Sequence, residues 1–318
     1  MLLTAVLTLG AAAASPPADP NLHPQQLVRL PDGRRINLLC EGRGSPTVLL
    51  DAGWNGGIGS WSDVQPELAK TTRTCAFDRA GMGFSDPGRP PRDTRAIVSD
   101  LVQTLKAAHI SGPYVLVGHS MGALDMRLYA SLHAKDTVGM VLVDPASEHQ
   151  DARMGARADA IVAKLNFCAD AAEAGKLVPG TPEDVRCVTP PRASLPEPVR
   201  ARLLAMKRTP AYTRTIASEY ENIATRDSDE IDAARRPLGE LPLIVLTAEA
   251  TGLNPGMSPE QQAAVAGMWR RMHDETAALS KRGENRLVAG SGHNIQVDKP
   301  QAVIAAVNEV VAQARRRR

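Results

Sequence analysis

The feature that most constrains this chain is the pentapeptide Gly118 to Gly122, which reads G-H-S-M-G. It follows the apolar run Tyr114 to Val117 and opens a stretch with helical spacing, Ala123 to His133. A G-x-S-x-G pattern between a strand and a helix is typical of a nucleophile elbow, a turn so tight that glycines flank the serine. The pattern therefore predicts that Ser120 projects from the end of a strand as a nucleophile.

A serine nucleophile needs a general base, and the chain has seven histidines. His109 and His133 end helical stretches, where a histidine stabilises the helix dipole or faces solvent. His119 lies inside the pentapeptide, and we expect it to point away from the serine side. His293 differs, because it lies in a glycine-flanked loop (Gly290 to Ile295) near the end of the chain. A serine followed by a final histidine fits the order Ser…Asp/Glu…His, so we predict that His293 is the base.

From residue 27 to residue 314 the chain resembles the α/β-hydrolase superfamily. The resemblance is carried by an opening hairpin, apolar strands, helical periods and a D-x-x-G-x-G-x-S loop. These segments are Leu27 to Cys40, Thr47 to Asp51, Thr74 to Phe77, Asp78 to Asp86, Thr94 to His109, Met140 to Val143, Leu243 to Thr247 and Pro300 to Ala314. Apolar strands that alternate with helices indicate a parallel sheet covered on both faces. The resemblance implies an α/β-hydrolase fold, with a mostly parallel eight-stranded sheet, helices on both faces and a helical cap insertion.

The expected organisation is a core interrupted by a cap. The first part of the core is expected at 27–144, the cap at 145–240 and the second part of the core at 241–318. The cap region is rich in Ala, Arg and Pro and lies where the family inserts its cap. Met154 to Leu165 and Val199 to Met206 have helical spacing, whereas Val178 to Pro196 is broken by prolines.

The resemblance also implies an oxyanion site. The loop Ala52 to Gly57 follows the strand that ends at Asp51 and looks like the family's oxyanion loop. In this reading the backbone N–H groups of Trp54 and Met121 hold the negative charge that develops on the reacting carbonyl.

The acid of the triad is where this chain departs from the family. The usual position, after the strand that follows the cap, holds Thr251, which cannot carry a charge. Two carboxylates can replace it. Asp144 ends a strand next to the nucleophile strand, as in some dehalogenase-like members, and Glu249 lies two residues before Thr251. We favour Asp144, because the acid must reach the histidine from a strand end, and Glu249 stays open as the alternative.

The four cysteines form an even number, which fits disulfide pairing in an oxidising compartment. In the fold implied above, the strands with Cys40 and Cys75 are neighbours, so their geometry allows a bridge. Cys168 and Cys187 both fall in the cap region and can close a local loop there. The alternative is four buried thiols. No C-x-x-C or Cys/His spacing indicates a metal site, and we expect no cofactor.

Residues 2–14 are uncharged and apolar and end at an A-x-A-like site, which predicts a signal peptide over residues 1–14. Such a segment is too short to span a bilayer. No Lys or Arg precedes Arg29, so the usual positive start is missing, and a disordered leader is the alternative. We expect export to the periplasm or the medium. A net charge of +2 over 318 residues does not indicate nucleic-acid binding, and we interpret the basic run at 315–318 as a solvated tail.

Together these features predict a serine hydrolase that cleaves a carboxylic ester, or a related acyl bond such as an amide, in a small molecule. Two alternatives use the same triad, a proline-iminopeptidase-like peptidase and an acyltransferase. From another class, the chain could be a ligand-binding protein with little turnover. An aspartate nucleophile would indicate a dehalogenase or an epoxide hydrolase, and Ser120 argues against both.

Overall fold

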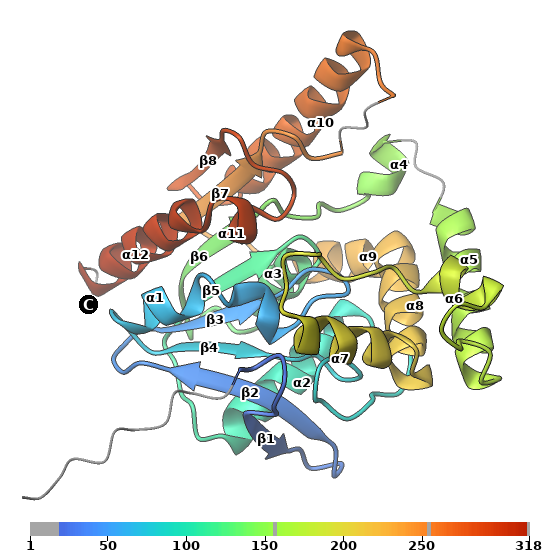
Figure 1. The fold of residues 1–318 in the computed structure, drawn as a ribbon. Helices are drawn as coiled ribbons and strands as arrows, with labels where there is room; N and C mark the ends of the chain where they lie inside the picture. The colour runs from blue at the N-terminus through green and yellow to red at the C-terminus, as the bar shows by residue number, and fades with distance from the viewer. Residues whose placement is uncertain (1–18, 155–157, 253–255, 317–318) are drawn as a thin grey trace, which may run out of the picture.

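The computed structural model describes residues 19–154, 158–252 and 256–316. Within them, eight strands form one sheet in the order β1-β2-β4-β3-β5-β6-β7-β8 (Figure 1). β2 is antiparallel to both β1 and β4, and all the remaining neighbours are parallel. The strands are β1 (Gln26–Arg29), β2 (Arg35–Glu41), β3 (Thr47–Asp51), β4 (Thr74–Phe77), β5 (Tyr114–His119), β6 (Thr137–Val143), β7 (Leu243–Ala248) and β8 (Gly283–Val288).

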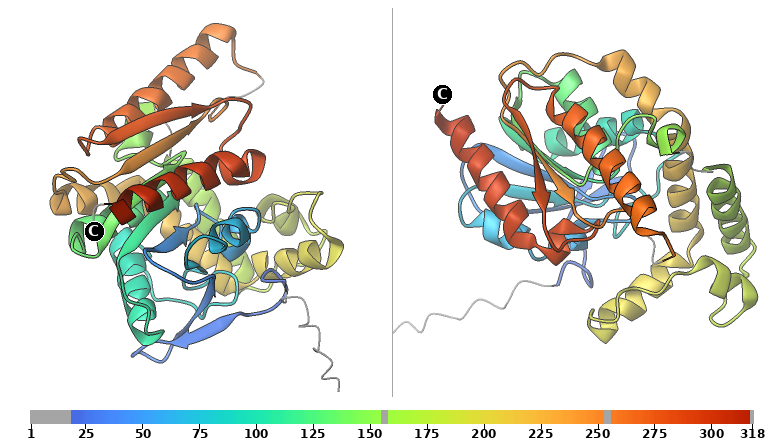
Figure 2. Two further views of the ribbon diagram at one scale, coloured as in Figure 1. Left: turned by 90° about the vertical axis from the view of Figure 1, so that its left-hand side faces the viewer. Right: turned by 90° about the horizontal axis from the view of Figure 1, so that it is seen from above.

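Alternate strand residues supply two apolar cores, one on each face of the sheet, because successive side chains of a strand point to opposite faces. Leu49 and Leu116 belong to one core, Val48 and Val115 to the other. The first core is covered by α2 (Thr94–Ala107), α3 (Gly122–Leu132), α9 (Asp227–Ala234) and α10 (Pro259–Ala277). The second is covered by η1 (Ile58–Trp61), α1 (Gln65–Ala69), α11 (Ile295–Asp298) and α12 (Pro300–Arg316) (Figure 2). The predicted fold class is confirmed.

The connection between β6 and β7 is helical. Before α9 its described helices are α4 (Gln150–Met154), α5 (Ala158–Glu173), α6 (Pro182–Cys187), α7 (Glu197–Lys207) and α8 (Pro210–Thr225). In place of the helix expected from Met154 to Leu165, α4 and α5 lie on either side of residues 155–157, which are outside the described part. The proline-rich stretch still contains α6, because Pro182 occupies the first turn, where a missing N–H costs nothing.

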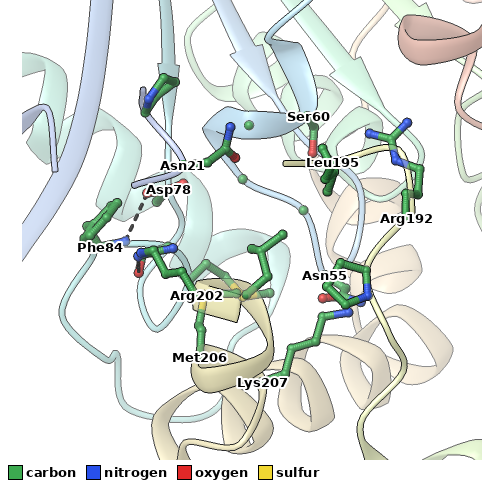
Figure 3. Close-up of a pocket in the computed structure, with 18 residues that line it drawn as sticks. Asn21, Asn55, Ser60, Asp78, Phe84, Arg192, Leu195, Arg202, Met206 and Lys207 are labelled. Carbon is green, nitrogen blue, oxygen red and sulfur yellow. Dashed lines mark hydrogen bonds between the residues drawn. The ribbon is translucent and has the colours of Figure 1, made fainter. Parts of the chain in front are cut away.

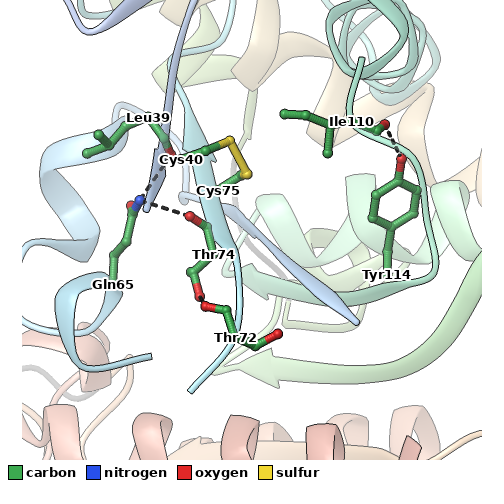
Figure 4. Close-up of a disulfide and its surroundings, with 8 residues drawn as sticks. All are labelled: Leu39, Cys40, Gln65, Thr72, Thr74, Cys75, Ile110 and Tyr114. Atoms are coloured by element: carbon green, nitrogen blue, oxygen red, sulfur yellow. Dashed lines mark hydrogen bonds between the residues drawn. A yellow bond between two sulfur atoms is a disulfide. The ribbon is translucent and has the colours of Figure 1, made fainter. Parts of the chain in front are cut away.

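Both predicted disulfides are present. Cys40 on β2 and Cys75 on β4 are directly opposite in the antiparallel pairing and are bonded (Figure 4). Gln65 of α1 lies beside this bridge and donates from Nε2 to the carbonyls of Leu39 and Thr74, at 3.0 and 3.3 Å. Cys168 and Cys187 connect α5 to the end of α6. One bridge therefore links two neighbouring strands of the sheet, and the other links two helices outside it.

Removing either bridge should destabilise the protein, because an open chain gains conformational entropy on unfolding. The bridges close loops of 35 and 19 residues. The chain-entropy model assigns loops of these lengths about 4 and about 3 kcal/mol. We expect the Cys40→Ala/Cys75→Ala and Cys168→Ala/Cys187→Ala variants to lose close to these amounts in urea unfolding. Free thiols at all four positions, in non-reduced peptides of the purified protein, would contradict the pairing.

Residues 1–14, predicted as a signal peptide, lie outside the described residues. In the part of the chain that the structure describes, no helix combines the length and the apolar character needed to cross a membrane.

Candidate active site

The G-x-S-x-G segment lies at the tip of β5, and the strand–turn–helix context predicted for it is present. Ser120 has a φ of +51°, in the left-handed region that L residues rarely adopt. The turn is tight enough to need its glycines. A Cβ on Gly118 would lie 2.4 Å from the carbonyl oxygen of Gly122, and a Cβ on Gly122 would lie 2.6 Å from that of Asp51. This geometry directs the Ser120 side chain away from the strand ladder.

His293 reaches Ser120 from the loop after β8. Its Nε2 lies 3.0 Å from Ser120 Oγ, and its side chain is 40% exposed. That distance allows the serine hydroxyl to donate a hydrogen bond to the imidazole. The exposure leaves the Ser120–His293 pair open to an incoming small molecule. The structure thus brings together two residues that are far apart in the sequence.

Asp144 completes a line of hydrogen bonds. His293 Nδ1 lies 2.6 Å from Asp144 Oδ2, and the Asp144 side chain is fully buried. The other carboxylate oxygen, Oδ1, accepts a hydrogen bond of 2.8 Å from the N–H of Ala248. Because a carboxylate only accepts, Nδ1 must carry the proton, which leaves Nε2 free to accept from Ser120. Asp144 has a φ of +41°, in a sharp turn directly after β6.

The two other positions weighed for the acid have different partners. Glu249 Oε2 accepts a hydrogen bond of 2.8 Å from the N–H of Gly290, so it holds the backbone of the histidine loop. Thr251, which fills the usual acid position, donates from its hydroxyl to Asp144 Oδ2. The threonine therefore supports the carboxylate that approaches the imidazole. Sequence reasoning missed this contact, because only the fold brings Thr251 to the end of β6.

His119 is buried and lies next to His293, with 4.8 Å between the ring centroids. Its Nε2–H donates to the carbonyl of His293 at 2.9 Å. Desolvation and the neighbouring His293 lower the pKa of His119 to about 3, so it is neutral near pH 7. From the sequence we expected His119 to point away from the serine. The structure adds a contact that the sequence did not predict, a hydrogen bond from the elbow strand to the histidine loop.

The loop predicted to hold the oxyanion packs directly on Ser120. A Cβ on Gly53 would lie 3.0 Å from Ser120 Cβ. Trp54 follows Gly53, and Met121 follows Ser120 just before α3 begins. Among the described residues, no carbonyl accepts a hydrogen bond from the backbone N–H of Trp54 or of Met121. Both donors predicted for the oxyanion are therefore available beside Ser120.

A buried arginine positions that loop. Arg79 donates from Nη1 to the carbonyl of Ala52 at 2.6 Å and from Nη2 to that of Gly53 at 2.8 Å. It also pairs with Asp51 on β3 and with Glu219 on α8, both at 2.9 Å. Burial would lower the pKa of Arg79, but the charges of Glu219 and Asp51 outweigh it and raise that pKa. The guanidinium therefore stays charged and joins the oxyanion loop to α8.

Two further contacts tie the loop to α8. The indole N–H of Trp54 donates to the carbonyl of Ile216 at 2.9 Å, and the hydroxyl of Tyr212 donates to Asn55 Oδ1. In the sequence, Asp78 and Arg79 were noted only as part of a loop that resembles the family's. Nothing near Glu219 in the sequence marks it as the partner of Arg79, so sequence reasoning missed this network.

Breaking the network should reduce stability and activity together. Glu219→Ala leaves the buried Arg79 without one of its two carboxylates, and such losses cost about 3–5 kcal/mol. Glu221→Ala, an exposed change on the same helix, is the matched control. We expect urea unfolding and ester turnover to show a loss for Glu219→Ala only. Equal behaviour of the two variants would show that Arg79 does not need Glu219.

The site therefore combines a line of hydrogen bonds from Ser120 through His293 to Asp144 with a neighbouring loop held by Arg79. Among the described residues, no group of three or more His, Cys, Asp and Glu side chains could hold a metal ion. A family model described as the alpha/beta hydrolase family matches residues 48–306, most of the chain. The chain belongs to the α/β-hydrolase family. This membership makes hydrolysis of a small molecule the general class of its activity.

The chain is also similar to individual proteins along most of its length. The chain is 25% identical over 271 residues to the protein YqjL of Bacillus subtilis, a match that covers 85% of each chain. Among solved structures, a thermophilic esterase from Thermogutta terrifontis superposes with a TM-score of 0.62 at 20% identity, over 91% of this chain and 99% of the esterase. The epoxide hydrolase CorEH superposes with a TM-score of 0.63 at 19% identity, over 91% of this chain and 98% of that one. At these identities the two structures show a shared fold.

Proposed function

We propose that this α/β-hydrolase is a serine hydrolase that cleaves a carboxylic ester, or a related acyl bond, of a small molecule. The observation that carries the proposal is the continuous line from Ser120 Oγ through His293 to Asp144, with distances of 3.0 and 2.6 Å. A base in contact with a hydroxyl, and oriented by a buried carboxylate, is the arrangement that activates a serine.

In this proposal His293 Nε2 takes the proton of Ser120 as Oγ attacks the carbonyl carbon. The N–H groups of Trp54 and Met121 hold the oxyanion. The imidazolium then gives its proton to the leaving group, and the tetrahedral intermediate collapses to an acyl-enzyme. Water attacks the acyl-enzyme by the same route in reverse and releases the acid. Asp144 holds the imidazole in the tautomer required and stabilises the imidazolium. Neutral His119 adds no second positive charge beside it.

The same triad serves a peptidase and an acyltransferase, so substrate tests must separate them. An epoxide hydrolase or dehalogenase of this fold uses an aspartate nucleophile. Because this chain has Ser120 at that position, we favour acyl chemistry over either of those reactions. We also propose that residues 145–240 act as the cap, although α9 within this range packs on α2 and α3 of the core. Two disulfides favour export to an oxidising compartment.

The test is a comparison of substrate classes with the purified protein. We expect turnover of p-nitrophenyl esters of short acyl chains, and slower or no cleavage of aminoacyl anilides, including the proline anilide. Faster cleavage of the anilides would favour the peptidase. Transfer of the acyl group to an added alcohol in preference to water would favour the acyltransferase, and absence of turnover with every substrate would favour the binding protein.

A further inference from the structure

A cavity of about 220 Å³ lies between the core and α7, beside the oxyanion loop (Figure 3). One wall is formed by Asn55 to Gly57 of that loop, by Gly59 and Ser60 of η1, and by Met82 to Phe84 of the loop after β4. The opposite wall consists of α7 and the segment that precedes it. Neither the triad nor the disulfides contribute to its lining.

The cavity adjoins the loop that packs against Ser120. Gly53 packs against Ser120, and Asn55, which lines the cavity, is only two residues further along the chain. Consecutive Cα atoms are 3.8 Å apart, so the Cα atoms of Gly53 and Asn55 lie within about 8 Å of each other. Trp54, whose N–H we assign to the oxyanion, lies between them. A substrate that uses the cavity therefore has to span the segment from Gly53 to Asn55, with its carbonyl at Ser120.

The described lining has an excess of positive charge. It contains Arg192, Arg202 and Lys207, and its one carboxylate is Asp78. Asp78 is buried and already accepts hydrogen bonds from Asn37 Nδ2 and from the backbone N–H groups at 58 and 84, at 2.8–3.1 Å. No ion pair joins it to the three cations, although its charge partly opposes the effect of burial, which lowers the pKa of Arg202. Lys207 and Arg202 point from α7 toward the side that carries Asn55 and Asp78 (Figure 3).

Among the described residues, no carboxylate oxygen lies within ion-pair distance of the three cations. Lys207 Nζ donates to the carbonyl of Thr189 at 2.9 Å, and burial lowers the pKa of Lys207. Arg202 donates to the carbonyl of Gly83 at 2.9 Å and stacks on the ring of Phe84. By contrast, Arg208, at the end of α7, pairs with Asp184 at 2.6 Å.

We propose that this cavity binds a carboxylate of the substrate, so that the preferred substrates are esters with a free carboxylate a few atoms from the reacting carbonyl. The inference rests on the serine hydrolase function proposed above and specifies its substrate class. Arg202 presents a planar guanidinium and Lys207 a mobile ammonium, two donors that bind carboxylates through charge-assisted hydrogen bonds. Backbone carbonyls hold them weakly enough for a carboxylate to replace these contacts.

The first experiment compares matched esters. Mono-p-nitrophenyl esters of succinate, glutarate and adipate have a free carboxylate. Each is assayed beside the matched neutral diester, in which that carboxylate is methylated and the p-nitrophenyl ester is kept. We expect the wild type to favour one or more of the acids over the matched neutral ester by roughly tenfold in kcat/KM, the order of one charge-assisted hydrogen bond. Lys207→Gln should remove this preference and leave the neutral esters within about twofold. Arg200→Gln, on the same helix but outside the cavity, should change neither.

Arg192→Gln provides a second variant, because its exposed side chain can be replaced without disturbing the fold. It should lower kcat/KM for the acids more than for the neutral esters. Equal rates for the acids and neutral esters in the wild type would overturn the proposal. So would a Lys207→Gln variant that loses activity on both kinds of ester equally.

A binding measurement separates this proposal from the function on which it rests. Calorimetric titration of the wild type with the succinate, glutarate and adipate dianions should show saturable binding that Lys207→Gln weakens by roughly tenfold and Arg200→Gln does not. Such binding without turnover of any ester would keep the carboxylate site and reject the hydrolase. Ester turnover without dianion binding or acid preference would keep the hydrolase and reject the carboxylate site.

Discussion

Ser120→Ala should lower kcat for ester hydrolysis by on the order of 10⁶-fold, as removal of the nucleophile does in a well-studied serine protease. The hydroxyl at the tip of β5 supplies the bond-forming oxygen, and no step of the mechanism can proceed without it. The variant should unfold at the same urea concentration as the wild type, because alanine fits the space that the serine leaves. The measurement is steady-state turnover of a p-nitrophenyl ester by both proteins.

Ser147→Ala is a suitable control, since it removes a buried serine close to the strand end without touching the triad line. Turnover by Ser120→Ala that remains within a factor of ten of the wild type would show that another group attacks the carbonyl.

Asp144→Asn should lower kcat by on the order of 10⁴-fold, the loss known when the triad carboxylate of a serine protease becomes an amide. The amide nitrogen can donate to Nδ1, which favours the tautomer with its proton on Nε2, and the imidazole then cannot accept from Ser120. Glu249→Gln should have a small effect by comparison, because the side-chain hydrogen bond of Glu249 among the described residues goes to the backbone N–H of Gly290 and not to His293. Kinetics of both variants with one ester provide the test.

Thr251→Val adds a third comparison, because it removes the hydroxyl that donates to Asp144 and keeps the shape of the side chain. We expect its loss in kcat to be about tenfold, the order of one hydrogen bond to a charged group. A large loss in Glu249→Gln with a small one in Asp144→Asn would move the acid back to the strand that follows the cap.

Much of the fold was predictable because its signals are local. Uninterrupted apolar runs such as Val115 to Val117 predict buried parallel strands, and the two sets of alternating strand residues account for both cores. The elbow was predictable for the same reason, since Gly118 and Gly122 are required within four residues of each other. The disulfide between Cys40 and Cys75 was predictable because the resemblance implied that their strands are neighbours.

The remaining parts of the site depend on long-range packing. Glu219 lies on α8, 140 residues after Arg79, and nothing near it in the sequence indicates an ion pair with that residue. His119 and Thr251 act on residues that lie 174 and 107 positions away, respectively. The cavity lined by Lys207 likewise arises only when α7 packs over the oxyanion loop. Such contacts carry no periodicity or spacing that sequence reasoning can detect.

The most direct test of the central claim is covalent labelling with a fluorophosphonate, followed by mass spectrometry of the labelled peptide. An activated serine beside an oxyanion site should attack the phosphorus and form a stable adduct. We predict one adduct per chain on Ser120 in the wild type, its absence in Ser120→Ala, and much slower formation in Asp144→Asn. An unlabelled wild-type protein, or an adduct on a residue other than Ser120, would contradict the assignment of this chain as a serine hydrolase.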